Sequence, residues 1–197
     1  MKKRIKNLAV LASGSGTTLQ AVIDAIENKT LKQKINIVIS DNKDSYALKR
    51  AKKHNIKTYI LKSKTNIERD EELCNILKDE KIDLVLLLGY LKLIGPKTIK
   101  KYTLINTHPS LIPAYCGKGM YGRNVHEAVY NNHEKETGVT IHFVNENYDE
   151  GNIIWQTHVP VYETDKPEDI SSRVQIIEKA QLIWVLKALQ EGKITKK

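Results

Sequence analysis

The stretch DLVLLLG at residues 83–89 decides the fold class of this 197-residue chain. It is apolar from Leu84 to Leu88 without alternation, which is typical of a parallel strand covered by helices on both faces. Runs rich in β-branched and other apolar residues also occur at 7–13, 35–40 and 57–61, and an amphipathic segment follows each of them. This pattern of βαβ units predicts an α/β protein with a mostly parallel, twisted sheet, right-handed crossovers and helices on both faces.

The rest of the chain continues the pattern. Helices are expected at 17–28, 45–54, 66–80, 96–101, 123–132 and 167–191, and further strands at 104–108, 138–145 and 153–161. The connection 109–122 is long for a compact protein, and such loops are usually functional or mobile. Because no repeat, low-complexity tract or linker divides the chain, we expect a single domain over residues 1–197.

The composition indicates a globular protein of a reducing compartment. Hydrophobic residues make up 41% and charged residues 28% of the chain, which fits neither a disordered nor a membrane-spanning protein. The basic start leads into a short apolar run and then a glycine turn, so we expect a first strand rather than a signal peptide. Cys74 and Cys116 form neither a disulfide framework nor a metal-binding spacing. We therefore expect a cytoplasmic protein with no membrane partner.

The net charge of +9 keeps nucleic acid, above all RNA, among the possible partners. The lysines, however, are spread along the sequence, and the densest basic clusters are the two ends, MKKRIK and KITKK. This distribution favours a solvated lysine-rich surface and anionic small-molecule substrates. We expect no nucleic-acid partner.

The segment SGSGTTLQ at 13–20 follows the first strand and opens the first helix. Glycines let backbone N–H groups approach an anion, and the helix N-terminus favours negative charge. The segment lacks the GK[ST] of a P-loop and the third glycine of a dinucleotide fingerprint, which favours a small phosphomonoester over ATP or NAD. A tight turn with a threonine cap is the alternative. The residues expected to hold the phosphate are Gly14, Ser15, Gly16, Thr17 and Thr18.

The next motif is Asn106-Thr-His108, at the end of a predicted strand that Pro109 breaks. Side chains two residues apart in a strand point to the same face, so Asn106 and His108 should lie side by side. An imidazole can carry a proton near neutral pH, and a carboxamide can donate to a developing oxyanion. The alternative is an ordinary capped strand end with a surface histidine.

The third motif is GVTIHFVNENYDEGNII at 138–154, where Val139, Ile141 and Phe143 share one face of a strand. The strand ends in an acidic loop that contains Asp149. A carboxylate there could raise the pKa of a histidine or position a water molecule for proton transfer. The alternative is a hydrophilic hairpin. His108, His142 and Asp149 could converge, but their spacing matches no metal motif, so we expect no metal.

Together these segments resemble the phosphoribosylglycinamide formyltransferase family, folate-dependent enzymes of purine synthesis. The similar segments are LASGSGTTLQAVIDA, ISDNKDSYALKRA, LLGYLKLIGP, INTHPSLIPAYCGKGMYG and GVTIHFVNENYDEGNII. They cover nearly the whole chain in the family's order. The resemblance implies a Rossmann-like formyltransferase fold and transfer of a formyl group from 10-formyltetrahydrofolate, as co-substrate, to the amine of glycinamide ribonucleotide, giving formylglycinamide ribonucleotide and tetrahydrofolate.

The resemblance also implies roles for individual residues. Asn106, His108 and Asp149 match the catalytic trio, in which Asn106 and protonated His108 hold the oxyanion and Asp149 keeps His108 charged. Gly14 to Thr18 match the nucleotide-phosphate loop, and Gln175 and Glu178 the helix that contacts the glycinamide end. The positions matching the folate site are Leu91, Lys92, Leu93, Ile94, Asn106, Asn145, Glu146, Asn147, Tyr148 and Asp149. A monomer or a homodimer is compatible with this assignment.

Related activities use a similar catalytic domain, and the trio does not separate them. Methionyl-tRNA formyltransferase is expected to need an additional basic C-terminal domain, and formyltetrahydrofolate hydrolase an additional N-terminal domain. The SGSGTT loop favours a phosphorylated small substrate over both. A non-catalytic phosphate- or nucleic-acid-binding module on the same fold is a further alternative, but such a binder has no need of the trio.

Overall fold

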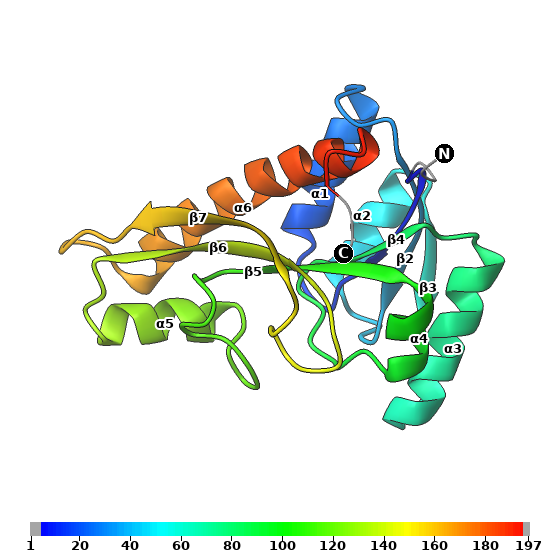
Figure 1. Ribbon diagram of the computed structural model, residues 1–197, viewed down its shortest axis with the longest axis horizontal. Coiled ribbons are helices and arrows are strands. Elements are labelled where there is room, and N and C mark those ends of the chain that lie inside the picture. Colours follow the sequence, from blue (N-terminus) through cyan, green and yellow to red (C-terminus); the bar gives the residue numbers. More distant parts are fainter. Residues whose placement is uncertain (1–4, 195–197) are drawn as a thin grey trace.

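A computed structural model describes residues 5–194 of the chain, and it has a seven-stranded sheet covered by helices on both faces (Figure 1). The strands lie in the order β3-β2-β1-β4-β5-β6-β7. All pairs among β1 to β5 are parallel, and β6 and β7 run antiparallel to their neighbours. This confirms the predicted mostly parallel α/β sheet. The basic clusters at the two ends lie partly outside the described residues.

The elements follow the predicted order. The strands are β1 (Asn7–Leu11), β2 (Lys34–Ser40), β3 (Lys57–Ile60), β4 (Leu84–Leu87), β5 (Thr103–His108), β6 (Glu136–Phe143) and β7 (Ile153–Pro160). The helices are α1 (Thr17–Glu27), α2 (Tyr46–Lys53), α3 (Asn66–Asp79), α4 (Pro96–Lys101), α5 (Arg123–Asn131) and α6 (Pro167–Gln190). The strand expected from 138 begins at Glu136, because its ladder with β7 continues to the Glu136–Pro160 pair.

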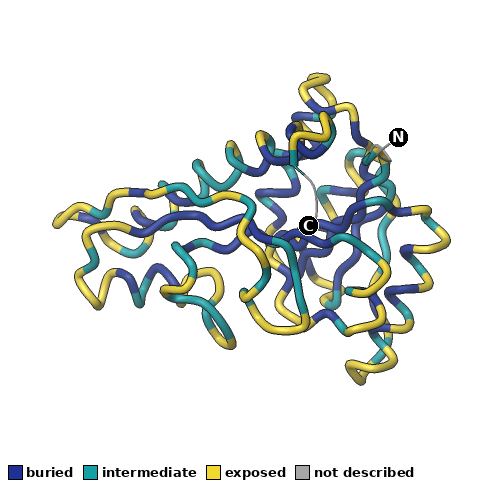
Figure 2. The backbone as a smooth tube through the Cα atoms, in the orientation of Figure 1, coloured by how far each residue is buried: buried dark blue, intermediate teal, exposed yellow. Residues whose placement is uncertain are grey.

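The sheet separates two apolar clusters, and alternate side chains of one strand enter different clusters. Leu8 and Val10 of β1 pack with residues of α1, α2 and α6, whereas Ala9 and Leu11 pack with residues of α3. All four residues of β4 are buried, as the unbroken apolar run predicts. Figure 2 shows the central strands as a buried layer, whereas the edge strands β3 and β7 are mostly intermediate or exposed. Burial on both faces fixes these strands at the centre of the sheet.

The topology creates a crevice at the carboxyl ends of β1 and β4. β1 pairs with β2 on one side and with β4 on the other, so the chain order reverses at β1. The connections leaving such a switch point diverge, and ligands of open α/β sheets bind there. The two connections are linked by Ser13 N–H, which donates to the Gly89 carbonyl at 3.0 Å. Within residues 5–194, no helix has the length and apolar character needed to cross a membrane.

Helix α4 begins at Pro96, as predicted, but its N-terminus is capped from another helix. The buried carboxylate of Asp70 in α3 accepts hydrogen bonds from Lys97 N–H at 2.8 Å and Thr98 N–H at 2.9 Å. Gly95 is required beside it, since a Cβ on Gly95 would lie 2.3 Å from the Asp70 carboxylate. Asp70 therefore ties α3 to α4 and supports the segment that follows β4.

Both tryptophans of the chain lie at the β7 edge of the sheet. Trp155 of β7 and Trp184 of α6 have ring centroids 4.6 Å apart, and they are 42% and 47% exposed. The pair forms a tilted contact between the last strand and the last helix.

We predict that Asp70→Ala lowers the free energy of unfolding by about 2 kcal/mol, because two buried N–H groups at the start of α4 lose their acceptor. The exposed Asp79→Ala in the same helix should change it by less than about 0.5 kcal/mol. Urea unfolding of both variants measures the difference. Equal effects of the two substitutions would contradict the capping role of Asp70.

Candidate active site

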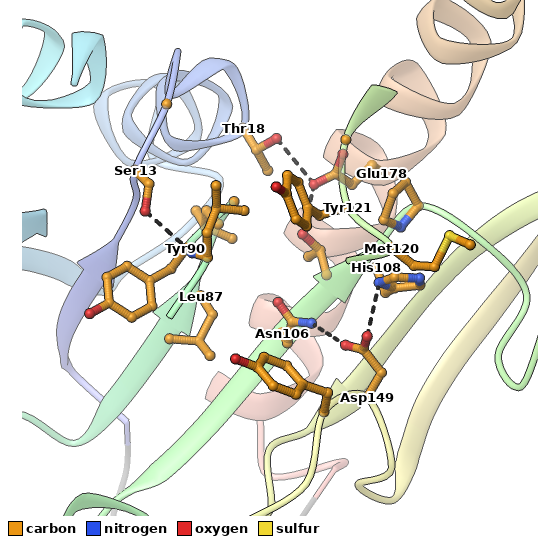
Figure 3. A pocket seen from close by; sticks show the side chains of 18 of the residues that line it. Ser13, Thr18, Leu87, Tyr90, Asn106, His108, Met120, Tyr121, Asp149 and Glu178 are labelled. Atoms are coloured by element: carbon orange, nitrogen blue, oxygen red, sulfur yellow. Dashed lines mark hydrogen bonds and ion pairs between the residues drawn. The ribbon is translucent and has the colours of Figure 1, made fainter. Parts of the chain in front are cut away.

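A cleft of about 1020 Å³ runs along the carboxyl ends of β1, β4 and β5 (Figure 3). Its walls are formed by the glycine-rich loop, the segment after β4, the loop before α5, the β6–β7 connection and the first turns of α6. The three sequence motifs, far apart in the chain, therefore meet around one cavity. Its size suits a drug-sized or larger ligand.

The glycine-rich loop forms one end of the cleft. Gly16 caps α1 with a left-handed φ of 68°, and a Cβ there would lie 2.7 Å from Ala47 Cβ, so only glycine fits. Among residues 5–194 no side chain caps the helix, and its N-cap is Gly16, so the threonine-cap alternative does not hold for this turn. The first-turn N–H groups of α1 lack a side-chain acceptor at the cleft wall, where an anion can satisfy them.

Glu178 of α6 lies at the same end of the cleft and accepts hydrogen bonds from two threonine hydroxyls. Thr107 donates to Glu178 Oε1 at 2.7 Å, and Thr18 donates to the same oxygen at 3.2 Å. The Thr18 hydroxyl is therefore directed at Glu178, whereas the sequence analysis assigned it to the phosphate. Burial raises the pKa of the Glu178 carboxyl. Gln175, one turn earlier, also lines the cleft.

The predicted trio meets at the base of the cleft, with Asp149 between the other two residues. Asn106 Nδ2 donates to Asp149 Oδ1 at 3.2 Å, and His108 Nδ1 lies 3.6 Å from Asp149 Oδ2 (Figure 3). Asp149 has a left-handed φ of 56°. Gly151 packs so close to the backbone of Phe143 that a Cβ on Gly151 would lie 1.6 Å from the Phe143 carbonyl oxygen. The tight turn after β6 thus aims the carboxylate back over β5.

His142 of β6 also reaches Asp149 and fixes the Asn106 amide. Its Nδ1 lies 2.9 Å from the Phe143 carbonyl oxygen, which can only accept, so the neutral ring carries its proton there. Nε2 then accepts from Asn106 Nδ2 at 3.1 Å. Both Asn106 N–H groups are therefore engaged by His142 and Asp149. The resting structure differs here from the predicted amide donor that is free for an oxyanion.

His108 is buried with one ring nitrogen bonded to the loop. Its Nε2 lies 2.8 Å from the Tyr115 carbonyl oxygen, so Nε2 carries the proton and Nδ1 faces Asp149. Burial lowers the pKa of His108, and nearby His142 acts in the same direction. The opposing effects of Asp149 and the Tyr115 carbonyl are smaller. Asp149 does act to raise the His108 pKa, as expected, but desolvation outweighs the carboxylate and the pKa is lowered overall.

Asp149 is ionised in this arrangement. Burial, the largest single influence, acts to raise its pKa, but contacts from His142, His108 and the Gly117 N–H together lower it. Gly117 N–H donates to Asp149 Oδ2 at 3.0 Å. The described residues contain no group of His, Cys, Asp and Glu arranged to hold a metal ion.

The predicted folate-site residues lie mostly in two walls of the cleft, the segment after β4 and the β6–β7 connection. Leu91, Lys92 and Leu93 are exposed at the cleft, and Ile94 is buried beneath them. Ser13 Oγ, which accepts from Leu91 N–H at 3.3 Å, connects this wall to the glycine-rich loop. The β6–β7 connection contributes Asn145, Asn147, Tyr148 and Asp149 to the lining. Glu146 is exposed and lies outside the lining, so the structure does not bring it to the cleft.

His126 of α5, which no sequence pattern indicated, lines the cleft and is only 3% exposed. Its Nδ1 is buried and has no hydrogen-bond partner among the described residues. Burial, with a smaller effect of His108, lowers its pKa to about 4. No spacing marked this residue, because α5 packs it against the site only in three dimensions. For His142, the signal was its place on the strand face opposite Val139 and Ile141.

Comparisons with known proteins agree with this geometry. A sequence model of the formyl transferase family matches residues 6–186. The chain is 37% identical to phosphoribosylglycinamide formyltransferase of Haemophilus influenzae, over 96% of this chain and 90% of that protein. It is 34% identical to the Escherichia coli K12 enzyme of the same name, over 95% and 89%.

A solved structure gives the same answer for the fold. The chain matches glycinamide ribonucleotide transformylase 1 from Symbiobacterium toebii with a TM-score of 0.90 and 31% identity, over 98% of this chain and 91% of that one.

We predict that His126 makes the protein acid-sensitive. The folded protein keeps this ring neutral down to about pH 4, whereas the unfolded chain binds the proton near pH 6.5. The free energy of unfolding should therefore fall as the pH drops from 6.5 towards 4, by up to about 3 kcal/mol from this residue. His126→Leu should flatten that dependence in urea unfolding between pH 7 and 4.5. The exposed His133→Leu is the control, and the same slope in both variants would contradict the prediction.

Proposed function

The chain belongs to the phosphoribosylglycinamide formyltransferase family, and from this premise we propose that it transfers the formyl group of 10-formyltetrahydrofolate to the amine of N1-(5-phospho-D-ribosyl)glycinamide. The observation that carries the proposal is the contact of Asn106 and His108 with the buried Asp149 carboxylate inside the cleft. The products would be formylglycinamide ribonucleotide and tetrahydrofolate, in de novo purine synthesis. The two substrates would approach this trio from opposite ends.

At one end, the start of α1 and its glycine-rich loop would hold the ribonucleotide phosphate. The uncapped first turn of α1 supports this role, because its N–H groups and the helix dipole both favour an anion. Gly14, Ser15, Gly16 and Thr17 would supply the contacts. Glu178 and Gln175 on α6 would then face the glycinamide end, with Thr18 orienting Glu178.

At the other end, the wall after β4 and the β6–β7 connection would hold the pterin. Leu91 and Leu93 offer exposed apolar surface against which the flat face of a heterocycle can pack. Asn145, Asn147 and Tyr148 would close over it from β6. Lys92 at the cleft rim would suit the anionic end of the folate.

The trio would then transfer the proton of the attacking amine and stabilise the negative charge that develops on the formyl oxygen. The formyl donor supplies the electrophilic carbon that the amine attacks. Neutral His108, with Nδ1 unprotonated, takes the proton released by the amine nitrogen, and Asp149 stabilises the resulting imidazolium. Nδ1–H then faces the oxyanion, and the Asn106 amide exchanges its 3.2 Å contact with Asp149 for that oxygen. Return of the proton to the folate nitrogen accompanies cleavage of its bond to the formyl carbon.

We also propose that the reaction needs no metal and takes place in the cytoplasm. The groups proposed above to stabilise charge are side chains and backbone N–H groups of the chain itself. A monomer or a homodimer would fit equally well, because the described residues of one chain supply both walls of the cleft.

The acceptor is tested by formyl transfer from 10-formyltetrahydrofolate to three acceptors in parallel. These are the glycinamide ribonucleotide, initiator methionyl-tRNA and water. Turnover with the ribonucleotide alone is the expected result. Turnover with tRNA or without an acceptor would overturn the proposed substrate, and the absence of turnover in all three reactions would overturn the activity.

We predict that Asp149→Asn and His108→Ala each lower kcat by about 10²- to 10⁴-fold, since each removes part of the proton-transfer pair. Folding should be retained, as judged by circular dichroism and urea unfolding. Lys78→Ala, on the exposed face of α3 and outside the cleft lining, serves as a control that leaves kcat nearly unchanged. Full activity of both trio variants would disprove the roles assigned to them.

A further inference from the structure

The loop segment from Tyr115 to Gly117 contacts both members of the acid–base pair through its backbone. The Tyr115 carbonyl accepts from His108 Nε2 at 2.8 Å, and Gly117 N–H donates to Asp149 Oδ2 at 3.0 Å. The two backbone groups are two residues apart, so one local conformation sets both contacts. Sequence motifs do not mark them, because any residue carries a carbonyl and an N–H.

That conformation is held by the Tyr115 side chain. Tyr115 has a left-handed φ of 52°, a backbone conformation that is unfavourable for a residue other than glycine. Its hydroxyl donates to Glu134 Oε1 at 2.6 Å and accepts from Asn132 Nδ2 at 2.7 Å. Both partners lie immediately after the end of α5. Two hydrogen bonds thus fix the Tyr115 hydroxyl, while the backbone carbonyl of the same residue accepts from His108 Nε2.

We infer that Tyr115 is a positioning residue whose clamped phenol selects the tautomer of His108. With the Tyr115 carbonyl in place, the ring proton stays on Nε2, and Nδ1 keeps the lone pair that must receive the amine proton. Without it, Asp149 draws the proton to Nδ1, and the resting ring cannot accept another proton at that atom. The inference rests on the proposed roles of His108 and Asp149.

The same segment also orients the Asp149 carboxylate. The Gly117 N–H donates to Oδ2 on the side of His108, while Asn106 Nδ2 donates to Oδ1. Displacement of the 115–117 backbone would therefore loosen the carboxylate and release the imidazole together. The loop acts on catalysis without touching the reacting atoms.

The test uses Tyr115→Phe in the full-length protein, which removes the hydroxyl clamp and keeps the ring. ¹⁵N-histidine NMR of the unliganded protein reports the His108 tautomer, with its signals assigned by comparison with His108→Ala. We expect the wild type to show the Nε2–H form and the variant a mixture with Nδ1–H. We further expect kcat to fall about 10- to 100-fold while both KM values change less than about threefold.

Tyr130→Phe, on the exposed face of α5, is the matched control and should change neither signal nor rate. If Tyr115→Phe does not fold, Glu134→Ala removes the acceptor of the clamp and carries the same expectation, and Glu134→Gln, which keeps an acceptor oxygen, should restore most of the rate. An unchanged tautomer in the folded variant, or a loss of rate equal to that of Tyr130→Phe, overturns the inference. A shifted tautomer in a protein with no formyl transfer would support the clamp and overturn the proposed function.

Discussion

The buried carboxylate of Asp149 is the group on which the site depends. A carboxylate withdrawn from water must be paired with donors. Here Asn106 of β5 and the Gly117 N–H of the loop donate to it, and the rings of His142 in β6 and His108 in β5 lie 3.5 and 3.6 Å from its oxygens. The tight turn at Gly151 and the left-handed backbone of Asp149 itself bring it there. One ionised group therefore organises residues from three parts of the chain, β5, β6 and the loop at Gly117, and the fold brings these parts together around it.

The fold was predictable because its information is local and periodic. The apolar run at 83–89 and the alternation of strands with amphipathic helices follow from burial on both faces of a parallel sheet, and the observed β4 is buried throughout. The ends of elements were less predictable where tertiary pairing sets them, as in the two extra residues of β6 that pair with β7. The Asp70 cap of α4 was also invisible to the sequence analysis, since the residues lie far apart in the chain.

The sequence predicted which residues form the candidate site, but not their hydrogen-bond directions, tautomers or pKa shifts. Asn106, His108 and Asp149 do meet, as their motifs predicted. The direction of the Asn106 amide and the net pKa shift of His108 depend on His142, Tyr115 and the degree of burial, which no spacing in the sequence records. His126 entered the site from α5 for the same reason. Electrostatics and tautomers are properties of the packed protein, and motifs supply only the groups that can carry them.

The placement of the two tryptophans determines what the protein's intrinsic fluorescence can report. Trp155 and Trp184 touch each other at the edge of the sheet, half-exposed, and neither lines the cleft. Indole emission is governed by the polarity and mobility of its immediate surroundings, so it monitors the seam between β7 and α6. Ligand titrations followed by this emission would be nearly silent on cleft occupancy. The same emission would report the separation of α6 from the sheet early in unfolding.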